Sequence, residues 1–62
     1  MSIRGLASKT TSQGVVNAVW YDEDEKNFVV QHEFVHLSFY EPDFMALVET
    51  LVEAKAKFER GS

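Results

Sequence analysis

The chain has 62 residues, a formal net charge of −4 and no cysteine. This length allows one domain at most, and the lack of cysteine excludes disulfides and thiolate-bound metals. No stretch approaches the ~20 apolar residues that a membrane-spanning helix needs, and the N-terminal residues lack the apolar core of a secretory signal, so we expect a cytoplasmic protein without a membrane partner.

Residues 1–13 are rich in Ser, Thr, Gly and Lys and show no hydrophobic periodicity. Such a composition is typical of an irregular segment. We therefore predict a flexible N-terminal tail over residues 1–13 and a single domain over residues 14–60. Residues 61–62 are assigned to the C-terminal end of the chain, outside that domain.

Two β-branched and aromatic runs follow the predicted tail. Residues 15–21 favour a strand, the polar run DEDEKN at 22–27 favours a hairpin loop closed by Asn27, and residues 28–39 favour a longer second strand. Pairing Tyr21 with Phe28 gives one plausible register for this hairpin. In that register both faces of the hairpin are largely apolar.

The period of the apolar residues changes after Tyr40. The 3-4-3 spacing of the next apolar residues predicts an amphipathic helix. Pro42 suits its first turn, and Gly61 is a suitable stop. The residues on this apolar stripe are Phe44, Leu47, Val48, Leu51 and Phe58. The fold predicted from these elements is α+β, with a β-hairpin followed by a C-terminal helix (a ββα protomer).

The string HEFVH at residues 32–36 resembles the H-E-x-x-H signature of zinc metalloproteases. In those enzymes the string lies on a helix, where both histidines share a face and reach one zinc ion. A strand advances about 3.3 Å per residue, so it would separate His32 and His36 by about 13 Å. Since the surrounding residues favour a strand, we expect no catalytic residues, no cofactor and no catalytic zinc.

A weaker metal site stays open as an alternative. In a symmetric dimer, His32 or His36 of one copy could meet the same residue of the other and bind a metal together with carboxylates. The simpler interpretation is that both histidines are ordinary half-buried strand residues.

Charge is unevenly distributed along the chain. Residues 21–49 contain eight acids and one lysine, a net charge of −7. An acidic surface repels phosphate, which disfavours nucleic-acid binding. The four acids Asp22, Glu23, Asp24 and Glu25 suggest either a solvated hairpin tip or an acidic surface that mimics nucleic acid and blocks a basic protein.

The two apolar hairpin faces favour self-association. One helix covers only one face of a sheet, and small chains without disulfides often need association to gain stability. We therefore expect a homodimer, joined through its sheets or intertwined, in which large apolar residues near the strand ends form the interface. These candidate interface residues are Trp20, Phe34, Val35, Leu37, Phe39 and Tyr40.

These features together predict a small, non-catalytic, homodimeric interaction or regulatory protein that binds an unidentified protein partner. The two alternatives are an acidic mimic of nucleic acid and a metal-binding protein that uses His32 and His36.

Overall fold

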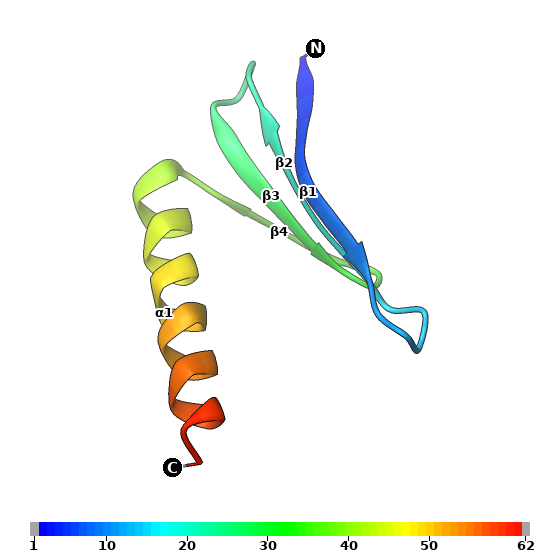
Figure 1. Ribbon diagram of the computed structural model, residues 1–62. Helices are drawn as coiled ribbons and strands as arrows, with labels where there is room; N and C mark the ends of the chain where they lie inside the picture. Colours follow the sequence, from blue (N-terminus) through cyan, green and yellow to red (C-terminus); the bar gives the residue numbers. More distant parts are fainter. Residues whose placement is uncertain (1, 62) are drawn as a thin grey trace.

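A computed structural model describes residues 2–61, and Met1 and Ser62 lie outside the described residues. The described chain forms one antiparallel sheet in which each strand pairs with the next in sequence, and a C-terminal helix follows it (Figure 1). The predicted α+β class is confirmed, with four strands where the sequence predicted two. The elements are β1 (Ile3–Thr10), β2 (Val16–Asp22), β3 (Asn27–His32), β4 (Val35–Phe39) and α1 (Glu41–Glu59).

The flexible tail predicted over residues 1–13 is wrong for most of its length, because Ile3–Thr10 forms β1 and pairs with β2. A register shift between Gly5 and Ala7 interrupts this pairing. Such a bulge breaks the period of two by which a strand is recognised in a sequence. The sheet therefore begins well before residue 14.

The turn between β1 and β2 is built on Thr11 and Gly14. The amide of Gly14 donates to the carbonyl of Thr11 (2.9 Å), and the amide of Thr11 donates to the carbonyl of Val15 (2.8 Å). Gly14 has a φ of 86°, a left-handed conformation that glycine adopts readily. This arrangement matches the three-residue hairpin loop that ends in a left-handed glycine.

The predicted register of the next hairpin is confirmed, since Tyr21 pairs with Phe28 across β2 and β3. The intervening loop is held by Asp22, whose Oδ1 accepts the amides of Asp24 (3.0 Å) and Glu25 (3.1 Å). The left-handed residue that closes this loop is Lys26, with a φ of 57°, and not Asn27 as the sequence suggested.

The single strand predicted over residues 28–39 is wrong, because the chain reverses at Glu33 and Phe34 and returns as β4. His32 pairs with Val35 across this two-residue turn. Glu33 has a φ of 56°, as the first central residue of a type II′ turn requires. Glycine is the usual residue there, so the sequence carries no turn signal. Val35–Phe39 therefore form a separate strand that pairs with β3.

The helix agrees closely with its prediction. Tyr40 is the N-cap residue but makes no side-chain capping bond, and Pro42 lies in the first turn. Glu41 and Asp43 near the N-terminus and Lys57 in the last turn complement the helix dipole. At the other end Gly61, with a φ of 76°, donates its amide to the carbonyl of Phe58 (3.0 Å) and ends the helix.

Candidate functional site

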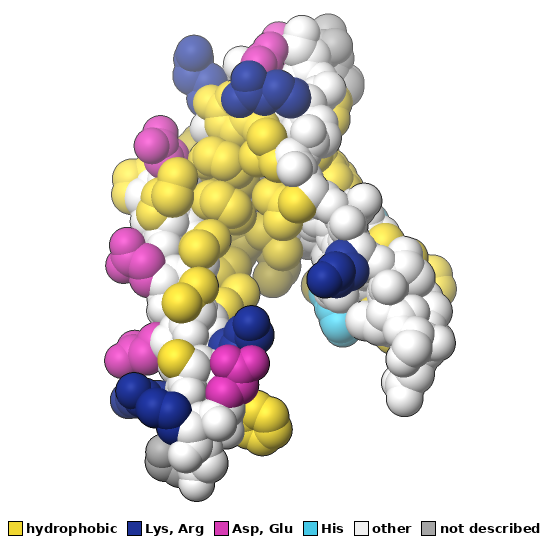
Figure 2. Space-filling model, viewed as in Figure 1, with side chains coloured by type: hydrophobic (Ala, Val, Ile, Leu, Met, Phe, Trp, Pro, Cys, Tyr) yellow, Lys and Arg dark blue, Asp and Glu magenta, His cyan; other side chains and the backbone are white. Residues whose placement is uncertain are grey.

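The helix leaves the sheet at an angle (Figure 1). An open cleft lies between the two layers. Hydrophobic side chains gather in this hollow (Figure 2). The cleft has a volume of about 690 Å³. Its lining comes from the first three strands and from the middle of α1. The lining residues are Ala7, Ser8, Lys9, Asn17, Ala18, Val19, Val30, Gln31, His32 and Leu51.

The sheet contributes three cross-strand rows of side chains to the face that α1 approaches. The first row, at the closed end of the cleft, is Arg4, Tyr21, Phe28 and Phe39. The second row is apolar throughout and consists of Ala7, Val19, Val30 and Leu37. The third row, at the open end, is Lys9, Asn17, His32 and Val35. The rows follow from the register, because alternate residues of a strand share a face.

Aromatic contacts close one end of the cleft. The ring of Phe44 from α1 stacks on the ring of Phe28, with centroids 4.1 Å apart and planes 3° from parallel. Tyr21 packs against the same Phe28 ring at 4.8 Å, and the guanidinium carbon of Arg4 lies 5.8 Å from the centre of the Tyr21 ring. These side chains attach the start of α1 to the sheet.

The apolar stripe of α1 begins against the sheet and ends in solvent. Phe44 and Leu47 are half-buried. Further along, Leu51 is 58% exposed and Phe58 is 82% exposed. From Leu47 to Phe58 the stripe runs for roughly 16 Å, at about 1.5 Å per residue. That length of apolar surface lacks an adequate apolar partner within the described chain.

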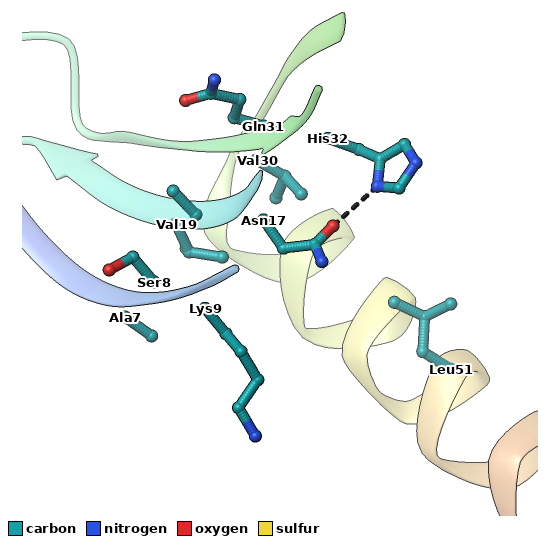
Figure 3. Close-up of a pocket in the computed structure, with 10 residues that line it drawn as sticks. Ala7, Ser8, Lys9, Asn17, Val19, Val30, Gln31, His32 and Leu51 are labelled. Carbon is teal, nitrogen blue, oxygen red and sulfur yellow. Dashed lines mark hydrogen bonds between the residues drawn. The ribbon is translucent and has the colours of Figure 1, made fainter. Parts of the chain in front are cut away.

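Three polar side chains, those of Lys9, Asn17 and His32, lie together at the open end of the cleft (Figure 3). Nδ1 of His32 donates a hydrogen bond to Oδ1 of Asn17, at 2.6 Å. Lys9 extends beside them from β1, and no described carboxylate forms an ion pair with it. The sheet side of the cleft therefore has an apolar centre and a polar, positively charged rim.

The six predicted interface residues do not form one surface. Val35, Leu37 and Phe39 alternate with Ser38 and His36 along β4, on the cleft side of the sheet. Tyr40 is exposed at the start of α1, and Phe34 is 93% exposed at the tip of the β3–β4 turn. Trp20 lies on the opposite face, where its ring meets the ring of His36 edge-on at 5.8 Å.

The chain reversal after His32 also separates the two histidines of the HEFVH string. His32 belongs to the cleft face, whereas His36 pairs with Gln31 and meets Trp20 on the other face. The prediction that both histidines lie on one strand is therefore wrong, because His32 belongs to β3 and His36 to β4. Residues 2–61 contain no cluster of three or more side chains placed to hold a metal ion.

The acidic hairpin tip is partly engaged within the chain. Oδ2 of Asp24 accepts the amide of Ser2 (3.0 Å), and the carboxylate of Glu23 lies 3.7 Å from the guanidinium of Arg4. Asp22 holds the loop through the two amide contacts described above. These contacts give the carboxylates of Asp22, Glu23 and Asp24 structural roles in the loop.

The cleft could not be identified from the sequence, because it depends on the angle between α1 and the sheet. Val19, Val30 and Leu51 are apolar strand and helix residues like many others, and only the tertiary arrangement makes them the lining of one cleft. The sequence carries one signal for the cleft, which is the length of the apolar stripe on the predicted helix. This stripe is longer than the surface that a short hairpin can cover.

The fold and cleft define a small α+β protein, a four-stranded antiparallel meander with one C-terminal helix and an open apolar cleft between them. Within residues 2–61 no helix has the length and hydrophobicity to cross a membrane. No protein-family model matches the sequence, and comparisons with curated proteins and with solved structures gave no match.

Proposed function

We propose that this chain is a small, non-catalytic interaction protein of the cytoplasm, which acts as a homodimer and binds another protein. The observation that carries the proposal is that none of the residues from 2 to 61 is buried. A chain with 45% hydrophobic residues normally encloses a core. Here the apolar residues are placed where a second polypeptide can cover them.

The dimensions of the chain support this proposal. Its radius of gyration is 13.2 Å, whereas a compact domain of this length is expected near 10.6 Å, or roughly a fifth less. The difference arises from the open angle between α1 and the sheet. An isolated chain of this shape leaves its apolar residues in water, and association with another protein removes that cost.

Two further surfaces are suited to the protein partner. Trp20 and His36 form an aromatic contact on the sheet face away from the cleft, and aromatic residues are enriched at the centres of protein interfaces. Phe34 extends from the nearby turn. These residues stay accessible when the cleft is filled, so they are the better candidates for contact with a different protein.

The non-catalytic part of the proposal is supported by the separation of the two histidines. The one string in the sequence that resembles a catalytic signature spans a turn, and its histidines lie on opposite faces of the sheet. A single zinc ion requires its ligand nitrogens at about 2 Å. This geometry does not allow both side chains of one chain to share an ion.

Sedimentation equilibrium between about 1 and 100 μM tests the homodimer, because these concentrations span typical self-association constants. We expect a mass of twice 7.1 kDa and a thermal midpoint that rises with protein concentration. A folded species of 7.1 kDa over the whole range contradicts the homodimer.

Partner binding is tested by affinity capture from the native host with the wild-type protein and a Trp20→Lys variant. We expect a protein that the wild type retains and the variant loses. Ser12→Lys, in the exposed β1–β2 turn, is the matched control for the added charge. Equal retention by all three proteins contradicts the proposed role of the Trp20 face.

A further inference from the structure

The cleft has two apolar walls that belong to one chain and stand apart. One wall is the central sheet row, which includes Val19 and Val30, and the other is the α1 stripe around Leu51. The hollow between them is open to one side (Figure 2), and the exposed residues of the stripe extend beyond it to Phe58. An occupant that covers both walls and the end of the stripe has to be long, apolar and roughly as wide as a helix.

We infer that the occupant is helix α1 of a second copy of this chain, and that the two copies exchange helices reciprocally. The inference rests on the proposed homodimer and specifies its geometry. In a two-fold symmetric dimer the same surface serves both copies, so each α1 enters the cleft of the other. The 19 residues of α1 give a helix about 28 Å long. Its stripe then contacts the partner's sheet, and the two helices contact each other between the sheets.

The exposed area of the chain fits this arrangement. The surface accessible to solvent is 5106 Å², whereas a compact protein of this mass exposes about 4,100 Å². The excess is therefore about 1,000 Å² per chain, or about 2,000 Å² per dimer. Stable protein interfaces bury roughly 1,200–2,000 Å² in total, and obligate homodimers bury more. Closing the two clefts thus supplies the area that a stable dimer needs.

Other occupants cover less of this surface. Joining two sheets at their edge strands adds backbone hydrogen bonds, but it leaves the stripe around Leu51 and Phe58 in water. A small apolar molecule of the cleft's volume contacts Leu51, but it does not reach the end of the stripe. A second copy covers the sheet wall and the stripe together.

The test uses two charged variants, one on each wall. Leu51→Glu places a carboxylate on α1, and Val30→Lys places an ammonium group on the central row of the sheet. Alone, each variant buries an unpaired charge twice in the exchanged dimer, and we expect dimerisation to weaken roughly 100-fold or more. Mixed and refolded together, they form a heterodimer that carries one Glu and one Lys, and the exchange brings these two side chains together in one cleft. Native mass spectrometry should therefore detect the heterodimer in the mixture.

Ser38→Lys is the matched control, because Ser38 lies on the sheet face away from the cleft, and it should dimerise like the wild type. If both cleft variants dimerise normally, the exchange is wrong and the copies meet elsewhere. If each variant is disrupted and mixing forms no heterodimer, the cleft closes on its own helix and the exchange is again wrong. Both results leave the proposed homodimer standing. A folded wild-type monomer contradicts the homodimer and the exchange alike, and leaves the cleft to a small apolar ligand.

Discussion

Phe44 of α1 stacks face to face on Phe28 of β3, with ring centroids 4.1 Å apart. Phe28 is also the residue that Tyr21 and Phe39 flank in the sheet. The ring of Phe28 therefore connects strand β3 to the first turn of α1. The remainder of α1 extends away from this attachment point, so the stack sets where the cleft begins.

Replacing Phe44 with alanine should destabilise the protein by about 2 kcal/mol. A fully buried phenylalanine costs about 3–5 kcal/mol when truncated to alanine, and Phe44 is half-buried. Urea unfolding at one fixed protein concentration measures the change. Phe44→Leu keeps the apolar contact and removes the stacked ring, so it should cost about 1 kcal/mol. Equal stability of the wild type and Phe44→Ala contradicts the role of the stack.

Glycine at position 33 should stabilise the protein by about 1 kcal/mol. Glu33 adopts a φ of 56° in the β3–β4 turn, and this conformation costs a residue with a Cβ atom about 1–2 kcal/mol. Glu33→Gly removes that strain, and the added freedom of the unfolded chain offsets part of the gain. Glu33→Ala keeps the Cβ atom and should leave the thermal midpoint nearly unchanged. A lower midpoint for Glu33→Gly than for Glu33→Ala contradicts the assigned turn.

Gly14 in the β1–β2 turn and Gly5 in β1 should respond to alanine in opposite directions. Gly14 has a φ of 86°, so alanine there should cost about 1 kcal/mol. Gly5 lies outside the left-handed region, and an added Cβ would meet no atom within 4 Å. Alanine at Gly5 should therefore stabilise the protein by about 0.5 kcal/mol, by restricting the unfolded chain. Chemical unfolding of both variants measures the contrast, and a loss of stability in both contradicts the strand assigned to the N-terminal residues.

The hydroxyl of Thr11 should contribute about 1 kcal/mol to the first hairpin. Its Oγ1 accepts the amides of Val15 at 3.1 Å and Gln13 at 3.3 Å. Thr11→Val keeps the shape of the side chain and removes both acceptor contacts, whereas Thr11→Ser keeps them. We expect Thr11→Val to lower the free energy of unfolding and Thr11→Ser to change it by less than half as much. The reverse order of the two variants contradicts the turn geometry.

The sequence predicted those elements whose local signals agree with their final structure. The register of Tyr21 with Phe28 and the position of α1 follow from periodicity and turn composition, and both are confirmed. The missed elements are those in which the local signal is absent. A bulge between Gly5 and Ala7 obscures the alternation of β1, and a glutamate holds the left-handed position at 33.

The predicted interface residues show a second limit of what the sequence alone can predict. Residue type indicated that Trp20 and Leu37 suit an interface, but the turn at Glu33 and Phe34 decides the face that Leu37 joins. A two-residue reversal places Leu37 beside Val30 on the cleft face. The cleft depends on the direction of α1, which no periodicity in the sequence encodes.

The meander topology has a consequence for the order of folding. Every strand pairs with its sequence neighbour, and hairpins of this kind close within about 1–10 μs. The sheet can thus form in a single chain while its apolar face is still uncovered. Meeting a second copy depends on concentration and is slower. Dilution should therefore slow the final phase of refolding while leaving the formation of the hairpins unchanged.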